Sequence, residues 1–570
     1  MCGIFALLNH SGIISDAYVK NAFNYGKKRG PEYSTLQNIY FNVTFGFHRL
    51  AINGINTISN QPLVFENITL IANGEIYNYK ELYKMLNITP TTDSDCEIII
   101  HCYKRFGIEY TLQILDGVFA FVLIDNDEND KKIYVGRDPY GVRPLYFCSG
   151  GIFNVIAFGS TMSMLMPIAS SQRSEIYHFA PGSYSVFELS HIISPQWKFL
   201  YNKRYSQITF STLNYDIECI EYYKDIFRNI NYLLKSAVYK RCSTSDRPIA
   251  CLLSGGLDSS LITSLVSTYF KERDLPPLET YSIGLEGSED LKYAQKVADF
   301  LGTNHTSVIM TKEEYVNAIP EVIHNIESYD TTTVRASIGN YLVAKYIAQH
   351  SQAKVIFSGE GADELAGGYL YMNNAPNAID FDHECKRLLK YIHVFDVTRC
   401  DKSISSNGLE PRTPFLDRAF TQYFLSIPAN IRYSGSIKRC FSRYNGCEKF
   451  LLRAAFDPEF CDDKIYLPNE ILWRTKEAFS DGVSSLKESA FEILQKHIDT
   501  IPLDDTKYQH NNPTTNEQKY YRNIFEYFYP DQGHIIPYFW MPRFVDAHDP
   551  SARTLKVYEE QHYELCERSL

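Results

Sequence analysis

The chain has 570 residues, of which 45% are apolar and 22% charged, enough for two or more domains of ordinary globular composition. Its formal net charge of −11 argues against nucleic acid as the main partner, because phosphate backbones are bound by basic surfaces. No apolar run reaches the roughly 20 residues of a membrane-spanning helix, and we see no signal peptide. We therefore expect a cytoplasmic protein that acts on small molecules, with no nucleic-acid or membrane partner.

The 13 cysteines are scattered and include no CxxC pair, which disfavours a zinc site. A disulfide framework is not expected in a chain of this length without an export signal. Cys2, in MCGIFALL, has two interpretations. It is either one more apolar residue of a strand or, once Met1 is removed, an N-terminal residue with both a thiol and an α-amine.

Residues 2–190 are predicted to form a domain built mainly of short strands. The strand candidates are CGIFALL, VTFGFHRLAI, ITLIANGEIYN and VFAFVLIDN. The last of these forms a predicted hairpin with KKIYVGRD, around an acidic, Asn-rich turn. EIIIHCYKRF has helical spacing, and residues 191–220 lose their periodicity, which predicts a linker.

Residues 221–570 are predicted to form a second domain, in which strands alternate with helices. The first unit, RPIACLLSGGLDSSLITSLVSTYFKE, is a predicted strand, loop and helix. Further strands are predicted in ETYSIGL, HTSVIM and KVIFSGEGADE, with helices between them. This alternation is typical of a parallel sheet covered by helices, where ligands bind at the carboxyl ends of the strands.

Two glycine-rich loops follow strands of this predicted sheet. SGGLDSS (254–260) lets the backbone approach a ligand, and the helix after it offers free N–H groups to an anion. The pattern GxxxxGK followed by Ser or Thr is absent. An ordinary strand–helix turn would explain this loop alone, but SGEGADE (358–364) follows another apolar strand. Together the loops would place Asp258 and Asp363 around one Mg²⁺.

SGGLDS resembles the pyrophosphate loop of the ATP-pyrophosphatases, and the whole pattern resembles the glutamine-hydrolysing asparagine synthetases. The further segments that carry the resemblance are SIGL (282–285), YDTTTVRAS (329–337), SGEGADELAGGY (358–369), PRTPFLD (411–417), RTKEAFSDG (474–482) and YFWMPRFVDAHDPSARTL (538–555). The resemblance implies ATP-dependent amidation of aspartate through a β-aspartyl-AMP intermediate, with Mg²⁺ as cofactor and AMP and pyrophosphate as products. It also implies a homodimer.

The same resemblance assigns roles in the second domain. The residues it places around ATP are Leu252, Ser254, Gly255, Gly256, Asp258, Ser259, Ile283, Ser358 and Gly359. Asp258 and Asp363 would hold Mg²⁺. Aspartate would be bound by Thr332, Thr333 and Arg335, since an arginine fork suits carboxylates. Glu360 would help deprotonate ammonia, and Lys476 would neutralise negative charge during adenylation. Taken singly, Arg335 and Lys476 would be interpreted as surface salt-bridge residues.

The first domain resembles the class II glutamine amidotransferases, N-terminal-nucleophile (Ntn) hydrolases with two antiparallel sheets between helices. The resemblance implies that Met1 is removed and that the Cys2 thiolate attacks glutamine, while the α-amine of Cys2 moves protons. Asn73 and Gly74 would form an oxyanion hole, although Asn-Gly between apolar stretches is also a hairpin signal. The implied glutamine-binding residues are Arg49, Ile52, Asn53, Asn73, Gly74, Glu75 and Asp95. Arg49 would hold the α-carboxylate, and Glu75 and Asp95 the α-ammonium.

Four positions depart from the family pattern: Lys28, Glu32, Phe47 and Thr161. Two alternative functions stay open. One is an amidotransferase of the same architecture that acts on another carboxylate, and the other is a binding protein without activity. The second is disfavoured because Cys2, Asp258, Glu360 and Asp363 are all present.

Overall fold

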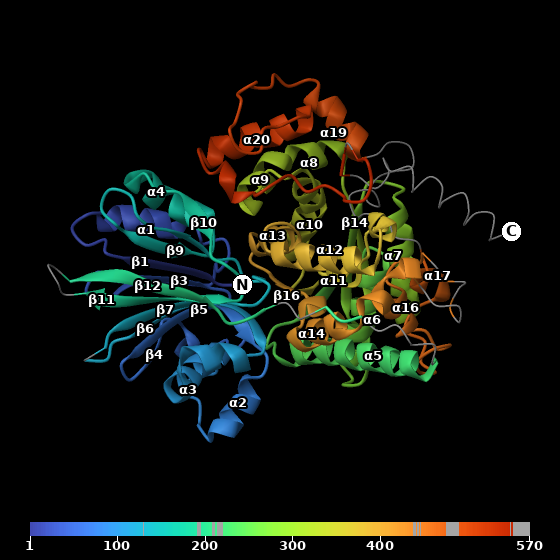
Figure 1. Cartoon of the computed structure of the whole chain (residues 1–570), viewed down its shortest axis with the longest axis horizontal. Helices are drawn as coiled ribbons and strands as arrows, with labels where there is room; N and C mark the ends of the chain where they lie inside the picture. Colours follow the sequence, from blue (N-terminus) through green and yellow to red (C-terminus); the bar gives the residue numbers. More distant parts are fainter. Residues whose placement is uncertain are drawn as a thin grey trace.

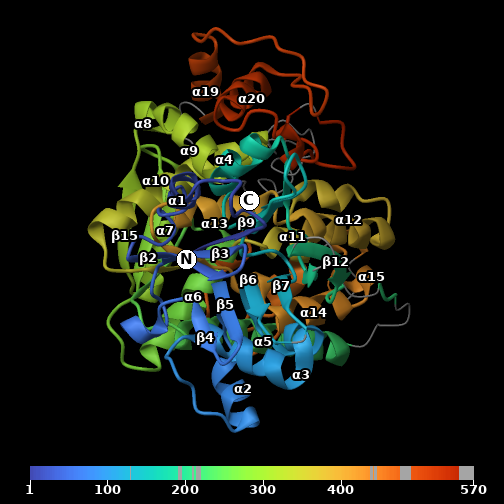
Figure 2. The same cartoon turned by 90° about the vertical axis from the view of Figure 1, so that its left-hand side faces the viewer.

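The computed structural model describes residues 1–128, 130–190, 195–207, 211–213, 220–436, 441, 444, 446–474, 490–547 and 549–550. Two domains lie side by side, and the N-terminus lies where they meet (Figure 1). The N-terminal domain is layered, with helices on the outer faces of two stacked sheets (Figures 1 and 2). The two-domain fold predicted from the sequence is therefore confirmed.

Both sheets of the N-terminal domain are antiparallel. The first has the spatial order β10 (Ile176–His178), β8 (Tyr146–Cys148), β9 (Ile156–Gly159), β1 (Gly3–Leu8), β3 (Val43–Arg49) and β2 (Tyr33–Tyr40). The second has the order β12 (Gln196–Arg204), β11 (Ser183–Ser190), β7 (Lys132–Arg137), β6 (Gly117–Asp125), β5 (Ile68–Ile76) and β4 (Leu63–Phe65). The helices of this domain are α1 (Asp16–Asn24), α2 (Tyr79–Leu86), α3 (Ile98–Ile114) and α4 (Met162–Gln172).

The alternation of side chains along β1 explains the layering. Phe5 and Leu7 belong to the core cluster that contains residues of α1 and α4. Ile4, Ala6 and Leu8 face the opposite way, into a cluster with β5, β6 and β7. Because successive side chains of a strand point to opposite faces, one fully buried apolar strand supports two separate cores.

The prediction that residues 191–220 form a linker is wrong for the first part of this range. Residues Gln196–Arg204 form β12, which pairs with β11 in the second sheet. Trp197 is fully buried between the sheets, and its backbone N–H donates to Asn9 Oδ1 at 2.9 Å. The other side chains of β12 are exposed, as expected of an edge strand. Its apolar residues do not alternate regularly with polar ones, so the pattern that marks a strand in the sequence is weak.

The C-terminal domain contains a parallel sheet with the order β15 (Asn304–Ile309), β14 (Glu279–Gly284), β13 (Ile249–Leu252), β16 (Val355–Phe357) and β17 (Glu410–Arg412). The chain builds outward from β13 through β14 to β15, then returns to the other side of β13 with β16. The strand order therefore reverses between β13 and β16. In parallel sheets, ligands bind at this point of reversal.

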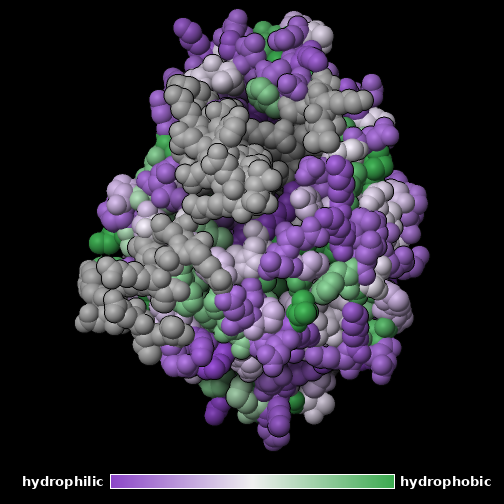
Figure 3. Space-filling model, turned by 90° about the vertical axis from the view of Figure 1, so that its right-hand side faces the viewer, coloured by the Kyte–Doolittle hydropathy of each residue, from purple (hydrophilic) through white to green (hydrophobic). Residues whose placement is uncertain are grey.

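The C-terminal domain also contains helices, several of which pack on this sheet. They are α5 (Ile220–Ser243), α6 (Leu257–Lys271), α7 (Glu289–Leu301), α8 (Lys312–Asn317), α9 (Ile319–Ile326), α10 (Thr331–His350), α11 (Ala362–Ala366), α12 (Ala378–Tyr391), α13 (Asp396–Ser405), α14 (Arg418–Ser426), α15 (Ala429–Arg432), α16 (Phe450–Ala454), α17 (Asn469–Leu472), α19 (Ala490–Ile498) and α20 (Asn516–Phe528). None of the helices in the described ranges is long and apolar enough to cross a membrane. The face of this domain shown in Figure 3 is mostly hydrophilic, with scattered apolar side chains.

The buried Trp197 provides a test of the revised domain boundary. We expect Trp197→Ala to lower the free energy of unfolding by about 3–5 kcal/mol, because a large core side chain is replaced by a cavity. Phe199→Ala, on the same strand but 55% exposed, is the matched control, with an expected loss below about 1 kcal/mol. Urea unfolding followed by circular dichroism measures both, and equal losses would contradict the placement of β12 in the core.

Candidate active sites

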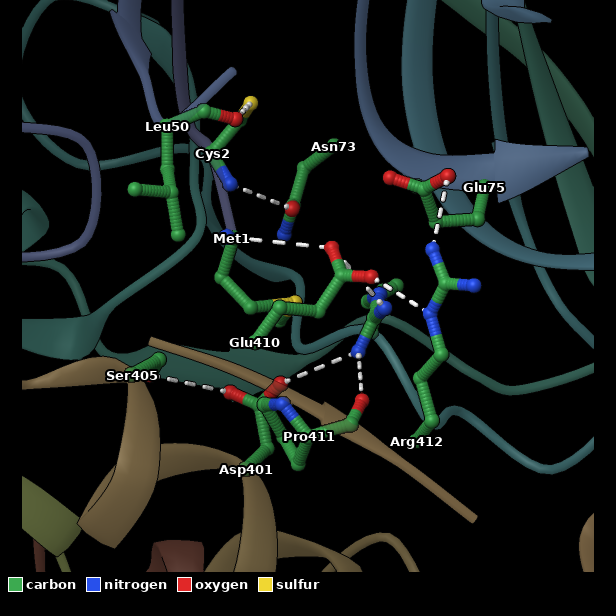
Figure 4. A network of polar contacts seen from close by, with 12 residues as sticks. Met1, Cys2, Leu50, Asn73, Glu75, Asp401, Ser405, Glu410, Pro411 and Arg412 are labelled. Atoms are coloured by element: carbon green, nitrogen blue, oxygen red, sulfur yellow. Dashed lines mark hydrogen bonds and ion pairs between the residues drawn. The ribbon is translucent and has the colours of Figure 1, made fainter. Parts of the chain in front are cut away.

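Cys2 lies directly before β1, where the two sheets of the N-terminal domain approach each other (Figure 4). Its backbone N–H donates to Asn73 Oδ1 at 3.1 Å, and its thiol donates to the Leu50 carbonyl at 3.6 Å. Asn73 belongs to β5 of the opposite sheet. Burial of the Cys2 thiol raises its pKa, and the neighbouring N-terminal ammonium lowers it by a smaller amount.

Asn73 and Gly74 lie inside strand β5, so the hairpin-turn alternative for this dipeptide is wrong. Asn73 is fully buried, and its Nδ2 has no hydrogen-bond acceptor in the described part of the chain. A buried donor without an acceptor is costly, and this geometry suits an oxyanion that forms at Cys2. Packing also requires glycine at position 74, because a Cβ there would lie 2.5 Å from the Val118 carbonyl oxygen.

Three polar residues of the predicted glutamine set gather near the C-terminal end of β5. Asn53 donates a hydrogen bond to the Glu75 carboxylate. Asp95 accepts one from the backbone N–H of Ile76 at 2.6 Å. Ile52, beside Asn53, is buried and apolar.

Arg49 ends β3, and its guanidinium holds the adjacent loop in place. It donates to Asn60 Oδ1 at 2.6 Å and to the Asn56 carbonyl at 2.8 Å. The structure thus places Arg49 next to Asn53 and Gly54, whose carbonyls it also contacts.

The carboxylates of this site are poorly solvated. Burial raises the pKa of Asp95 to about 6. The pKa of Glu75 is raised well above its usual value, first by burial and then by the nearby carboxylates Glu410 and Asp95. A bound cation, such as the ammonium of an amino acid, would offset both effects by favouring the ionised forms.

A buried ionic network joins this site to the C-terminal domain (Figure 4). The Met1 ammonium lies 3.8 Å from Glu410, a residue of β17. Glu410 also pairs with Arg412 at 3.0 Å and with Arg143 of the N-terminal domain at 3.5 Å. Arg412 in turn lies 3.3 Å from Glu75. Sequence analysis assigned no role to Arg143 or Glu410, because nothing in their local patterns indicates burial.

The second site is a cavity of about 220 Å³ at the reversal point of the parallel sheet. Of the residues predicted to bind ATP, Leu252, Ser254, Gly256, Asp258, Ser259, Ile283, Ser358 and Gly359 line it. Gly255 has a φ of +76°, and a Cβ there would lie 2.5 Å from the backbone nitrogen of Ala294. A Cβ at Gly359 would lie 2.8 Å from the Ser259 nitrogen, so glycine is needed for the two loops to meet.

Asp258 and Asp363 converge as the sequence predicts. The ammonium of Lys449 lies 2.5 Å from a carboxylate oxygen of each. Two carboxylates that share one cation are a donor set that suits Mg²⁺ with phosphate oxygens. In the described residues, no group of three or more His, Cys, Asp or Glu side chains is arranged to hold a metal.

Glu360 also lines the cavity, where it is paired with Arg399 of α13. The Arg399 Nε donates to Glu360 Oε1 at 3.2 Å, and its Nη1 lies 3.1 Å from Asp396. Burial raises the pKa of Glu360, and the positive charge of Arg399 lowers it by less. Arg399 therefore holds the carboxylate in a fixed orientation.

The three residues predicted to bind aspartate separate in the structure. Thr332 lines the cavity, but Thr333 and Arg335 do not. The Thr333 hydroxyl donates to Asp330 at 2.8 Å, at the start of α10. Arg335 forms ion pairs with Glu517 at 2.5 Å and Asp549 at 2.8 Å. Because both carboxylates already pair with its guanidinium, Arg335 would bind a substrate carboxylate only if that group replaced Glu517 or Asp549.

Lys476 lies outside the described residues, so its predicted role stays a prediction. The cavity also contains basic residues that the sequence analysis missed: Arg399, Lys449, Arg453 and Arg474. Arg474 donates to the Gly255 carbonyl at 3.3 Å. Of these four residues, only Arg474 lies in a segment that carried the family resemblance, RTKEAFSDG. The segments around the other three have an ordinary helical pattern.

Comparison with known protein families matches both domains. Residues 1–194 match the glutamine amidotransferase domain family, and residues 229–381 and 373–534 match the asparagine synthase family. Glutamine-hydrolysing asparagine synthetases from Gallus gallus and Homo sapiens are 42% and 40% identical to this chain. Each alignment covers 98% of this chain and 99% of the relative.

The chain is also similar to solved structures at lower identity. A glutamine phosphoribosylpyrophosphate amidotransferase from B. subtilis has 18% identity and a TM-score of 0.29, over 48% of this chain and 65% of its own. The full-length relatives decide the family. The chain belongs to the glutamine-hydrolysing asparagine synthetases.

Proposed function

We propose that this protein makes L-asparagine from L-aspartate, with ammonia released from L-glutamine and with ATP converted to AMP and pyrophosphate. The observation that carries the proposal is the joining of two sites in one chain. The thiol of Cys2 lies beside Asn73 at one site, and two glycine-rich loops meet at the cavity of about 220 Å³ at the other. A product assay with ATP, Mg²⁺, glutamine and aspartate tests it, and absence of asparagine would refute it.

At the first site, Cys2 is the nucleophile. Removal of Met1 would turn its amide nitrogen into a free amine, which can take the thiol proton and pass it to the leaving ammonia. The tetrahedral intermediate would be stabilised by Asn73 Nδ2, whose hydrogen-bonding capacity is otherwise unused in the described residues. Glu75 and Asp95 would bind the α-ammonium of glutamine, and Arg49 its α-carboxylate.

Strand β17 contacts residues of both sites. Glu410 and Arg412, next to the Cys2 site, belong to β17. β17 pairs with β16, and the Ser358 N–H donates to the Arg412 carbonyl at 3.0 Å. Ser358 already lines the ATP cavity, so we infer that ammonia passes across these two strands.

At the second site, Asp258 and Asp363 would hold Mg²⁺, which neutralises charge on the pyrophosphate leaving group. The backbone at the start of α6 would bind phosphate oxygens. Aspartate would lie beside Thr332, with its β-carboxylate toward the α-phosphate. Glu360, held by Arg399, would accept a proton as ammonia attacks the β-aspartyl-AMP. Transfer to a different carboxylate is the alternative, and the same assay with glutamate in place of aspartate separates the two.

Cys2→Ala should abolish glutamine-dependent synthesis, by at least about 10³-fold, because no nucleophile remains. Ammonia-dependent synthesis should stay within about twofold, since the second site is unchanged. Asparagine production with each nitrogen source measures both. Cys461→Ala, a partly buried thiol in the other domain, is the control. Intact mass must show that Met1 is absent, and glutamine use by Cys2→Ala would refute the nucleophile.

Asp363→Asn should abolish both activities, because it removes one of the two carboxylates assigned to Mg²⁺. We expect a loss of at least about 10²-fold in pyrophosphate release, whichever nitrogen source is used. Asp299→Asn, an exposed carboxylate on α7, is the matched control. Normal pyrophosphate release by Asp363→Asn would contradict the metal assignment.

Glutamine binding should strengthen as the pH rises from 5 to 7. With a pKa of about 6, Asp95 is about one-tenth ionised at pH 5 and about nine-tenths at pH 7, and only the ionised form attracts the ammonium. Calorimetry of glutamine binding to Cys2→Ala should show a gain of up to about tenfold. Asp95→Asn should reduce this gain, because only Glu75 then titrates at the site, whereas Asp93→Asn, exposed in the same loop, should keep it. An equal gain in Asp95→Asn would contradict the assignment.

A further inference from the structure

Lys449 is buried between the two carboxylates assigned to magnesium. Only 1% of its side chain is exposed, and its ammonium lies 2.5 Å from Asp258 Oδ2 and 2.5 Å from Asp363 Oδ1. It precedes α16 with a φ of +57°, in the left-handed region that few non-glycine residues adopt. Such backbone strain persists where the surroundings require it, and it is concentrated at functional sites.

A glycine makes room for this lysine. A Cβ at Gly368 would collide with Lys449 Cε and with Asp363 Oδ1. Gly368 does not have a left-handed φ, so a side chain is excluded there by contact and not by backbone strain. Lys449, Gly368 and the two carboxylates therefore form one built arrangement, from three separate parts of the chain.

We infer that Lys449 is a positioning residue of the synthetase reaction, which holds Asp258 and Asp363 at one point and yields that point to Mg²⁺. The inference rests on the magnesium assignment in the proposed function. An ammonium and a metal ion cannot share one position between two carboxylates, so metal entry requires Lys449 to move. Two partly buried carboxylates without a cation repel each other, so Lys449 keeps the pair assembled before the metal arrives.

Manganese binding tests this displacement. Mn²⁺ is detected by electron paramagnetic resonance, so its affinity for the full-length enzyme is measured without turnover. Lys449→Met should bind Mn²⁺ about tenfold more tightly than the wild type, because no resident cation has to be displaced. In EDTA the same variant should have a lower melting temperature, which Mn²⁺ restores, since the carboxylates are left uncompensated.

Two further variants make the result decisive. Lys449→Gln removes the charge but keeps a polar side chain in the same space, so it should also increase Mn²⁺ affinity, and it decides the question if Lys449→Met does not fold. Lys292→Met removes an exposed charge from α7 of the same domain and should bind Mn²⁺ like the wild type. Unchanged or weaker Mn²⁺ binding in the deciding variant would overturn the inference and leave Lys449 a structural ion pair.

This outcome is separable from the proposed function. If the wild type makes asparagine but Lys449→Met gains no affinity for Mn²⁺, only the displacement is refuted. If the wild type makes no asparagine, the proposed function fails, and the Mn²⁺ comparison still reports on Lys449.

Discussion

The arrangement of the two domains depends on charges that are buried where they meet. Glu410 and Asp401 of the C-terminal domain are almost fully buried, and so are Arg29 and Arg143 of the N-terminal domain. Arg29 Nη1 lies 2.8 Å from Asp401, while its Nε donates to the Cys2 carbonyl at 3.1 Å. If one partner of such a pair were removed, the other charge would stay buried and unpaired, which costs several kcal/mol per ion. This constraint fixes Cys2 against the synthetase domain.

The same pairing recurs at two carboxylates with proposed chemical roles. Glu75 lies against Arg412, and Glu360 lies against Arg399. In each pair an arginine from another element of the chain lowers the pKa of the acid, which offsets part of the rise caused by burial. α13 connects the two sites, because Arg399 contacts Glu360 while Asp401, two residues later, contacts Arg29.

Two of the departures from the family pattern, Glu32 and Lys28, have structural explanations at the same interface. Glu32 accepts a hydrogen bond from the Ala51 N–H at 2.7 Å and pairs with Arg247 of the C-terminal domain at 2.7 Å. Lys28 donates to Asn325 of that domain at 3.3 Å. His48 is buried against Phe23, with ring centroids 3.8 Å apart, and burial lowers its pKa to about 4. A neutral histidine is thereby part of the core.

Sequence by itself determined the two domains, their fold classes and the loops that carry the chemistry, because these depend on local periodicity and on short contiguous motifs. SGGLDSS and SGEGADE lie where their flanking strands predict. Strand β12 was not predicted, since its apolar residues do not alternate regularly with polar ones and most of them are exposed. Only the tertiary structure decided that Lys449 joins Asp258 and Asp363, and that Arg335 faces Glu517 and Asp549. Those contacts join residues far apart in the chain, and their energies depend on burial, which no local pattern encodes.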